Sequence, residues 1–267
     1  MGRSDGDVYV IRTDVCDEYF LECWEKMRKE LGQQSVYVAY DNTNKTLTKS
    51  FVKKYGKSNI VNVSSNKCKE VNPFHQDMCY SVESILARCV KKIYPKRYNH
   101  MWLIDNDIFC DGSWKVIMNK INNSSSSTKH ADLLGTYTVK KYSPAEKDWP
   151  HWNKVMGRLG RSVPVHKRAK CFFPLTRFSR KLLRAVVKEI GHSGGFSEVY
   201  IPTLAVANNL KIEDIPSSVI GKFDWRPVAI QHNNDNKLYH QYRTGFVPVG
   251  LRTGSAPTKC TCVPINH

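Results

Sequence analysis

The most constraining feature of this chain is a short apolar run that ends in two carboxylates. Met101–Ile104 is followed at once by Asp105, Asn106 and Asp107. A continuous apolar run of this length is typical of a strand that is buried on both faces of a sheet. Ligands of open α/β sheets bind just beyond the carboxyl ends of such strands. The run therefore predicts a buried strand that carries Asp105 and Asp107 to a ligand-binding edge.

The spacing of the two carboxylates favours a divalent cation. Carboxylates held this close repel each other unless a positive charge lies between them. Mg²⁺ and Mn²⁺ prefer oxygen ligands and are commonly bound together with phosphate groups. The alternative is that Asp-Asn-Asp only opens a polar turn before a helix predicted over Ser113–Ile121.

Strands and helices alternate in the first half of the chain. The predicted strands cover Asp7–Thr13, Ser35–Tyr40 and Asn59–Val63, and the predicted helices cover Asp17–Leu31, Thr48–Tyr55 and Asp77–Ile93. This alternation is typical of parallel strands joined by right-handed helical crossovers. The chain has no Walker loop and no G-x-G-x-x-G after its first strand, which weakens a dinucleotide-binding interpretation.

Polar residues follow the predicted strands at their carboxyl ends. Arg12 and Thr13 end the first strand, and Asp41 follows the second. Because a nucleoside rests at this edge in open α/β sheets, these residues are candidates for nucleotide contacts. Arg88, on the helix before the Asp105 strand, is a candidate phosphate ligand, and the alternative is an ordinary solvated arginine.

The second half of the chain is predicted to be less regular. Loops are predicted over Ser64–His75 and Asn122–Lys129, a strand over Asp132–Val139, and helices over Phe178–Ile190 and from Ser197 to about Leu210. Lys140–Lys170 is basic, irregular and rich in aromatic residues. Within it, Trp149 and Trp152 would either stack on sugar rings or pack over the sheet.

Composition limits the class of partner and the compartment. A chain of 267 residues with 41% hydrophobic residues is long enough for a large buried core. Its net charge of +17 favours anionic partners, namely nucleotide phosphates, nucleic acid or an anionic membrane surface. Nine scattered cysteines, no apolar signal core and no apolar run of membrane-spanning length predict a cytoplasmic protein.

Three features, taken in chain order, resemble the glycosyltransferases of the GT-A fold. They are Asp105-Asn106-Asp107, the glycine-rich loop Gly191–Gly195 that leads to Glu198, and a late histidine. The runs Phe172–Arg180 and Ser197–Leu204 are similar to small sugar transferases of bacteria and large DNA viruses.

The resemblance implies an α/β fold, with a single domain built on a Rossmann-like mixed sheet flanked by helices. The domain would cover residues 1–249, with a nucleotide-binding half at about 1–122 and an acceptor-binding half at about 130–249. Residues 250–267 would form an irregular tail.

The family also implies a nucleotide-sugar donor, such as UDP-xylose, UDP-glucose or UDP-galactose, with Mn²⁺ or Mg²⁺ on its diphosphate. By position, Asp107 would bind the metal, and Asp105 would bind it through water or bind the donor ribose. His232 would be the third metal ligand, and His240 is the alternative.

Glu198 matches the carboxylate that acts as general base in inverting members of the family. Such a base must lie within hydrogen-bond reach of the acceptor hydroxyl, here on a glycan. The resemblance places Gly194 and Gly195 close to this acceptor, and Trp149 and Trp152 are the aromatic candidates for its binding. If Glu198 only complements its helix dipole, a retaining mechanism remains open.

Two other classes of protein are compatible with parts of the sequence. A haloacid-type phosphatase would use Asp105 as its nucleophile, but that pattern requires Thr or Val where this chain has Phe109. A basic nucleic-acid-binding module would fit the charge, yet no nucleic-acid-binding motif is recognisable and no specific nucleic acid is expected. A basic surface would equally suit an enzyme in peripheral contact with an anionic membrane.

Overall fold

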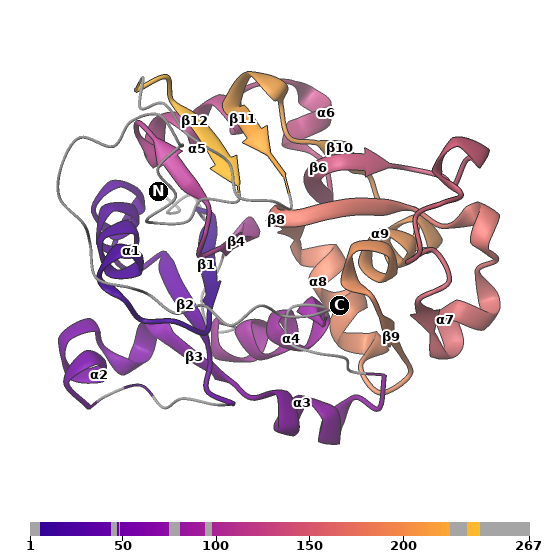
Figure 1. Cartoon of the computed structure of the whole chain (residues 1–267), viewed down its shortest axis with the longest axis horizontal. Coiled ribbons are helices and arrows are strands. Elements are labelled where there is room, and N and C mark those ends of the chain that lie inside the picture. The colour runs from indigo at the N-terminus through magenta and orange to yellow at the C-terminus, as the bar shows by residue number, and fades with distance from the viewer. Residues whose placement is uncertain are drawn as a thin grey trace, which may run out of the picture.

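A seven-stranded mixed sheet organises the fold (Figure 1). The computed structural model describes residues 6–43, 47, 49–74, 81–93, 98–224 and 234–240. The strand order is β10-β6-β8-β4-β1-β2-β3. These strands are β1 (Val8–Thr13), β2 (Val36–Asp41), β3 (Ile60–Val63), β4 (His100–Asp105), β6 (Leu133–Val139), β8 (Lys170–Ser179) and β10 (Ile212–Asp214).

Half of the sheet is parallel, as the alternating pattern predicts. Strands β3, β2, β1 and β4 run parallel to one another. The helices between them are α1 (Glu18–Leu31), α2 (Lys49–Tyr55), α3 (Ser65–Val71) and α4 (Val82–Ile93). Asp17 caps α1 by accepting a hydrogen bond from the Phe20 amide at 2.8 Å, and Gly32 ends it with a φ of 100°.

The other half of the sheet contains antiparallel pairs. Strand β8 runs antiparallel to both β4 and β6. The mixed sheet that the family resemblance implies is therefore confirmed, whereas the alternating pattern alone predicted parallel strands. Phe178 and Ser179, predicted to start a helix, instead end β8. Helix α8 (Arg180–Glu189) follows, and Ser179 caps it by accepting from the Leu182 amide at 3.2 Å.

Two small sheets and several short elements complete the architecture. The second sheet has the order β11-β12-β5 and the third pairs β7 with β9. Their strands are β5 (Phe109–Asp111), β7 (Val155–Met156), β9 (Ser193–Gly195), β11 (Ile220–Phe223) and β12 (Lys237–His240). The remaining helices are α5 (Trp114–Asn122), α6 (Ser126–Lys129), α7 (Gly157–Ser162) and α9 (Ser197–Ala207), with 3₁₀ turns at Lys57–Asn59, Pro144–Glu146, Val165–Lys167 and Ser217–Val219.

Two short helices lie where the sequence pattern predicted loops. Helix α3 lies within the predicted loop Ser64–His75, and α6 lies within the predicted loop Asn122–Lys129. Each buries a single side chain, Cys68 in α3 and Thr128 in α6. A helix with one buried residue has no apolar period, so the sequence pattern could not reveal it.

Strand β4 lies at the centre of the hydrophobic core. Met101 and Leu103 belong to one buried cluster, and Trp102 and Ile104 belong to the cluster on the opposite face of the sheet. All four side chains are at most 1% exposed. The prediction of a strand buried on both faces is confirmed.

A buried arginine ties β8 to the neighbouring helices. The Arg177 side chain is 1% exposed and donates hydrogen bonds to the Asn122 side chain at 3.1 Å and to the carbonyls of Thr128 and Ala131. Burial lowers the pKa of Arg177 to about 10, and the charge of Asp7 opposes this shift. The guanidinium therefore satisfies backbone groups that would otherwise be buried without a partner.

Replacing Arg177 with alanine is expected to lower the free energy of unfolding by about 3 kcal/mol or more, because it removes these bonds and opens a cavity. Urea denaturation followed by circular dichroism measures the change. The control is Arg161→Ala at an exposed position, which should change stability by less than about 0.5 kcal/mol. Equal unfolding midpoints for the two variants would contradict the structural role of Arg177.

Within the described ranges, no helix is both long and apolar enough to cross a membrane.

His232 and the predicted tail, residues 250–267, lie outside these ranges. The division of the domain into two halves at about residue 122 stays a prediction.

Candidate functional site

The carboxyl edge of the parallel strands brings Arg12 and Asp105 together. The two residues are register partners on β1 and β4. Arg12 donates through Nη2 to Asp105 Oδ2 at 2.7 Å, and its Nε donates to Oδ1. Burial alone would lower the pKa of Arg12, but the charges of Asp105, Glu198 and Asp107 outweigh it and raise that pKa. The guanidinium therefore stays charged at this edge.

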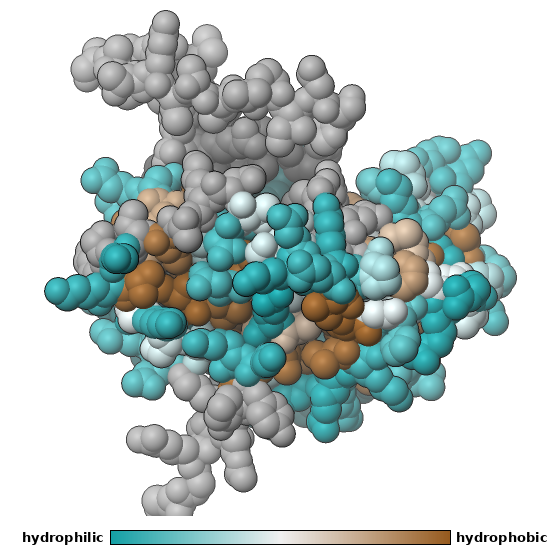
Figure 2. All heavy atoms as spheres, turned by 90° about the horizontal axis from the view of Figure 1, so that it is seen from below, coloured by the Kyte–Doolittle hydropathy of each residue, from teal (hydrophilic) through white to brown (hydrophobic). Residues whose placement is uncertain are grey.

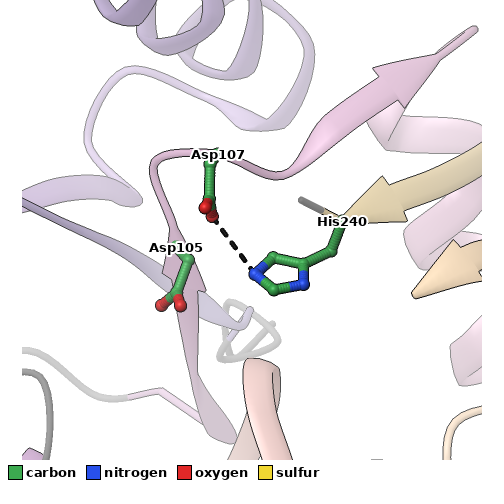
Figure 3. A group of neighbouring side chains, drawn as sticks. All are labelled: Asp105, Asp107 and His240. Carbon is green, nitrogen blue, oxygen red and sulfur yellow. Dashed lines mark ion pairs between the residues drawn. The ribbon is translucent and has the colours of Figure 1, made fainter. Parts of the chain in front are cut away.

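A histidine from the far end of the described chain completes the group. Strand β12 pairs antiparallel with β5, with Tyr239 opposite Phe109. The next residue, His240, consequently lies beside the turn that carries Asp107. Its Nε2 is 3.4 Å from Asp107 Oδ1, and Figure 3 shows the two side chains turned toward each other. His240, the alternative ligand considered from the sequence, therefore lies at the site.

Asp105, Asp107 and His240 form a donor set that suits a divalent cation. One ligand atom from each lies within 4.8 Å of the other two. Two carboxylate oxygens and an imidazole nitrogen are ligands that Mn²⁺ accepts, and the carboxylates also suit Mg²⁺. The carboxylate oxygens of Asp105 point away from His240 in Figure 3, consistent with their bonds to Arg12. Asp107 and His240 are thus the better aligned pair.

Glu198 lies at the same edge of the sheet. It is in the first turn of α9, and its Oε1 accepts a hydrogen bond from the Phe173 amide at 3.1 Å. Leu175 on β8 is paired with Ile104 on β4, so Phe173, two residues earlier on an antiparallel strand, lies beyond the end of β4. The backbone register therefore positions the Glu198 carboxylate near Asp105.

Burial is the main cause of the raised pKa of Glu198. It raises the pKa of this carboxyl to about 7, while the Phe173 amide and the Arg12 charge act in the opposite direction and Asp105 adds to the increase. A carboxylate with a pKa near neutrality can accept a proton at physiological pH and return it.

A cavity of about 370 Å³ opens beside Glu198. It is lined by Tyr137, Trp149, Lys170, Cys171, Phe172, Glu198, Phe223 and Asp224. The His240 ring packs against two of these residues, with ring centroids 5.3 Å from Phe172 and 5.8 Å from Phe223. The cavity therefore adjoins the Asp107–His240 pair. Aromatic walls with a few charged groups are typical of sites that bind small molecules.

The two tryptophans predicted to contact an acceptor have different environments. Trp149 lines the cavity, and the Lys170 ammonium lies 4.8 Å from its ring centroid. Trp152 is 2% exposed and packs edge-on against Trp149 and Tyr142. A buried ring cannot stack on a ligand, so Trp152 agrees with the packing alternative, and its contact supports Trp149.

Gly194 and Gly195 are buried in β9, where they pair with Met156 and Val155 of β7. A Cβ atom on Gly195 would lie 2.1 Å from the Lys154 carbonyl oxygen. These glycines allow two backbones to pack closely, and neither lines the cavity beside Glu198. The structure thus gives them a packing role in β9, and their approach to an acceptor stays a prediction.

The remaining candidates for nucleotide contacts lie at two places. Thr13 and Asp41 are at the carboxyl ends of β1 and β2, where each closes a local turn: Thr13 Oγ1 bonds both backbone groups of Val15, and Asp41 accepts from the Thr43 amide at 2.9 Å. Arg88 instead lines a separate cavity where α3 and α4 meet, so the phosphate contact predicted for it does not fit the Asp105 site.

Several residues of the cavity could not be predicted from the sequence. Tyr137 is 60% exposed and has a φ of +50°, at an irregularity in the β6–β8 pairing, and such strain in a bulky residue is common at functional sites. Lys170 and Phe223 carry no local motif, and they reach the cavity only through long-range strand pairing. A bulge or a non-local pairing leaves no short-range sequence signal.

No protein-family model and no curated protein matches the chain. Among solved structures, it is similar to a cytidylyltransferase from Leptospira borgpetersenii serovar Hardjo-bovis, with 11% identity, a TM-score of 0.38, and coverage of 79% of this chain and 75% of that chain. It is also similar to a putative glucose-1-phosphate thymidylyltransferase from Bacillus anthracis in complex with sucrose, with 8% identity, a TM-score of 0.41, and coverage of 79% and 87%. Likeness at this level assigns neither family nor activity, so function is argued below from the site itself.

Proposed function

We propose that this protein is a metal-dependent glycosyltransferase. It would move a sugar from a nucleotide-sugar donor, a UDP-sugar such as UDP-xylose, UDP-glucose or UDP-galactose, to a glycan hydroxyl. The observation that carries the proposal is the meeting of Asp105, Asp107 and His240 beside Glu198 and an aromatic cavity.

The donor diphosphate would lie at the carboxyl edge of the sheet. Asp107 and His240 would hold Mn²⁺ or Mg²⁺, and Asp105 would bind it through water or bind the donor ribose. When bound, this ion supplies positive charge that stabilises the leaving diphosphate. Arg12 keeps Asp105 in one orientation and adds a fixed positive charge beside the diphosphate.

Glu198 is the proposed general base. The acceptor hydroxyl would lie in the cavity and donate a hydrogen bond to the Glu198 carboxylate. The oxygen of the acceptor hydroxyl would attack the anomeric carbon of the donor, and the hydroxyl proton would pass to Glu198. The bond between the anomeric carbon and the diphosphate would break, and its electron pair would leave on the diphosphate. Attack from the face opposite the leaving group inverts the anomeric configuration.

The Arg12 ion pair disfavours the phosphatase alternative. Both oxygens of Asp105 accept hydrogen bonds from the guanidinium. A carboxylate engaged in this way is a poor nucleophile, because attack on phosphorus requires a free lone pair directed at the phosphorus atom.

The pH dependence of transfer is expected to follow Glu198. Because the pKa of this carboxyl is raised to about 7, the base is mostly protonated and inactive below that pH. The rate should rise about tenfold per pH unit below about pH 7 and level off above it. Initial rates of transfer measured between about pH 5 and about pH 9 give the midpoint of the pH–rate profile, which should lie within about one pH unit of this pKa. A flat profile across this range would contradict the role of Glu198.

Tyr137 is expected to contribute to acceptor binding. Its hydroxyl donates to the Phe223 carbonyl at 2.8 Å, which leaves the exposed ring face available to a sugar. Tyr137→Ala should raise the acceptor KM by about three- to tenfold with little change in the donor KM. Val116→Ala, at another exposed apolar residue, is the control and should change neither constant. Equal acceptor KM values for the two variants would exclude Tyr137 from the acceptor site.

The proposal is tested by incubating the purified protein with UDP- and GDP-sugars and a panel of glycan acceptors. Mass spectrometry should detect a glycan heavier by one sugar, formed with Mn²⁺ or Mg²⁺ and not with EDTA. Transfer that persists in EDTA would contradict the metal assignment, and release of phosphate without transfer would favour the phosphatase.

A further inference from the structure

Helices α3, α4 and α8 meet on one side of the molecule, around a cavity of about 220 Å³ that is separate from the Glu198 site. The cavity is lined by Cys68 and Val71 from α3, by Ala87, Arg88 and Lys91 from α4, and by Ile190 at the end of α8, among others. Figure 1 shows α3 at the lower edge of the molecule with α4 above it, and α4 packs on α8. We call the outer surface of these three helices the basic helix face.

Positive charge dominates the basic helix face. Its basic residues are Lys67, Lys69, Arg88, Lys91, Lys92, Arg180, Lys181, Arg184 and Lys188, all exposed except the half-buried Arg88. Of the acidic residues on the three helices, Glu83 is buried and bonded to Ser197, and Glu189 is bonded to Arg158. Only Glu70 offers an exposed carboxylate against this charge. A field of one sign over three helices favours an extended anionic partner.

Apolar side chains lie within this charged surface. Val71 is 60% exposed and Val187 is 41% exposed, and both belong to the small set of large hydrophobic residues that the described parts of the chain expose. Ile190, three residues after Val187, lines the cavity together with Val71. Seen from the side on which α3 lies, the surface shows apolar patches between hydrophilic side chains (Figure 2).

We propose that the basic helix face docks on an anionic lipid membrane. Lysine and arginine side chains would contact the lipid headgroups, and Val71 and Val187 would enter the boundary between headgroups and acyl chains. Single-stranded nucleic acid is the less suitable partner, because its binding relies on aromatic side chains that stack on bases, and none of the residues of α3, α4 and α8 is aromatic. This proposal is independent of the chemistry at the Glu198 site.

Vesicle flotation with the full chain tests the proposal. At about 0.1 M salt, the protein should bind phosphatidylcholine vesicles that contain about 30 mol % phosphatidylserine, and binding should fall steeply toward about 0.5 M salt. Binding to pure phosphatidylcholine vesicles should be at least about tenfold weaker. Equal binding to both kinds of vesicle, or to neither, would overturn the proposal.

Charge-reversed variants locate the binding face. Arg184→Glu/Lys188→Glu on α8 should lower partitioning to anionic vesicles by about tenfold or more, because two cations near the headgroups become anions. Lys29→Glu/Lys120→Glu, at exposed positions on α1 and α5, makes the same change in net charge away from the basic helix face and should leave most of the binding intact. An equal loss in both variants would show that net charge alone attracts the protein, and would overturn the assignment to this face.

A second pair of variants separates lipid from other polyanions. Val71→Ser/Val187→Ser should weaken vesicle binding by about threefold or more and leave retention on a heparin column unchanged, because heparin offers no apolar phase. Unchanged vesicle binding in this variant would overturn membrane docking. Binding to single-stranded DNA without binding to anionic vesicles would also overturn it and assign the face to nucleic acid.

Discussion

Replacing Glu198 with glutamine is expected to lower the rate of sugar transfer by about 10²–10⁴-fold and to leave nucleotide binding unchanged. Glutamine keeps the size of the side chain and an oxygen that can accept the hydrogen bond from the Phe173 amide. It cannot accept the proton of the acceptor hydroxyl, because an amide is not a base at neutral pH. Initial rates at saturating donor and acceptor measure the loss, and calorimetric titration with UDP measures nucleotide binding.

The matched control for this variant is Glu213→Gln. Glu213 forms an ion pair with Lys140 at the edge of the sheet, so the same change there removes one carboxylate outside the cavity. Its transfer rate should stay within about twofold of the unsubstituted protein, as is usual for a surface change. Near-normal turnover in Glu198→Gln would remove Glu198 as the base and favour a retaining mechanism.

Replacing Asp107 with asparagine is expected to weaken metal-dependent nucleotide binding by about 100-fold or more, because the neutral amide loses the charge that binds the cation. Asp107 is the carboxylate directed at His240, with 3.4 Å between Oδ1 and Nε2. His240→Ala should have an effect in the same direction. The Kd for UDP at fixed Mn²⁺, measured for each variant, quantifies the loss.

Asp148→Asn is the control for the metal site, since Asp148 is exposed and contributes no ligand atom to the Asp105–Asp107–His240 group. It should bind UDP and Mn²⁺ as the unsubstituted protein does. An unchanged Kd in Asp107→Asn would contradict the assignment of the metal to this group, whatever the transfer rate.

Local sequence signals predicted the parallel half of the fold and two of the three residues of the candidate metal site. The apolar run Met101–Ile104 identified β4 because each of its side chains is buried in one of the two clusters of the core. Asp105 and Asp107 follow from that strand by position alone. Ser179 and Asp17 cap their helices through bonds within the first turn, so these helix starts depend on local sequence alone.

Long-range pairing explains what the sequence could not provide. His240 reaches Asp107 only because β12 pairs with β5, two segments that are more than a hundred residues apart in the sequence. Strand β8 was missed because the following helix pattern extends back over Phe178 and Ser179, which in the fold pair with β4. Trp152 was a candidate for the acceptor by residue type and Gly195 by the family resemblance, whereas their burial is decided by neighbours that the sequence pattern does not reveal.

The proposed function depends on Asp105, Asp107 and His240 forming a metal-dependent site for a nucleotide diphosphate. The decisive experiment is calorimetric titration of the purified protein with UDP, first with Mn²⁺ and then with EDTA. We expect saturable binding of UDP with Mn²⁺ and its loss with EDTA, with GDP as a comparison. Absence of binding to UDP and to GDP in both conditions would rule out this site and leave Asp105-Asn106-Asp107 as a polar turn.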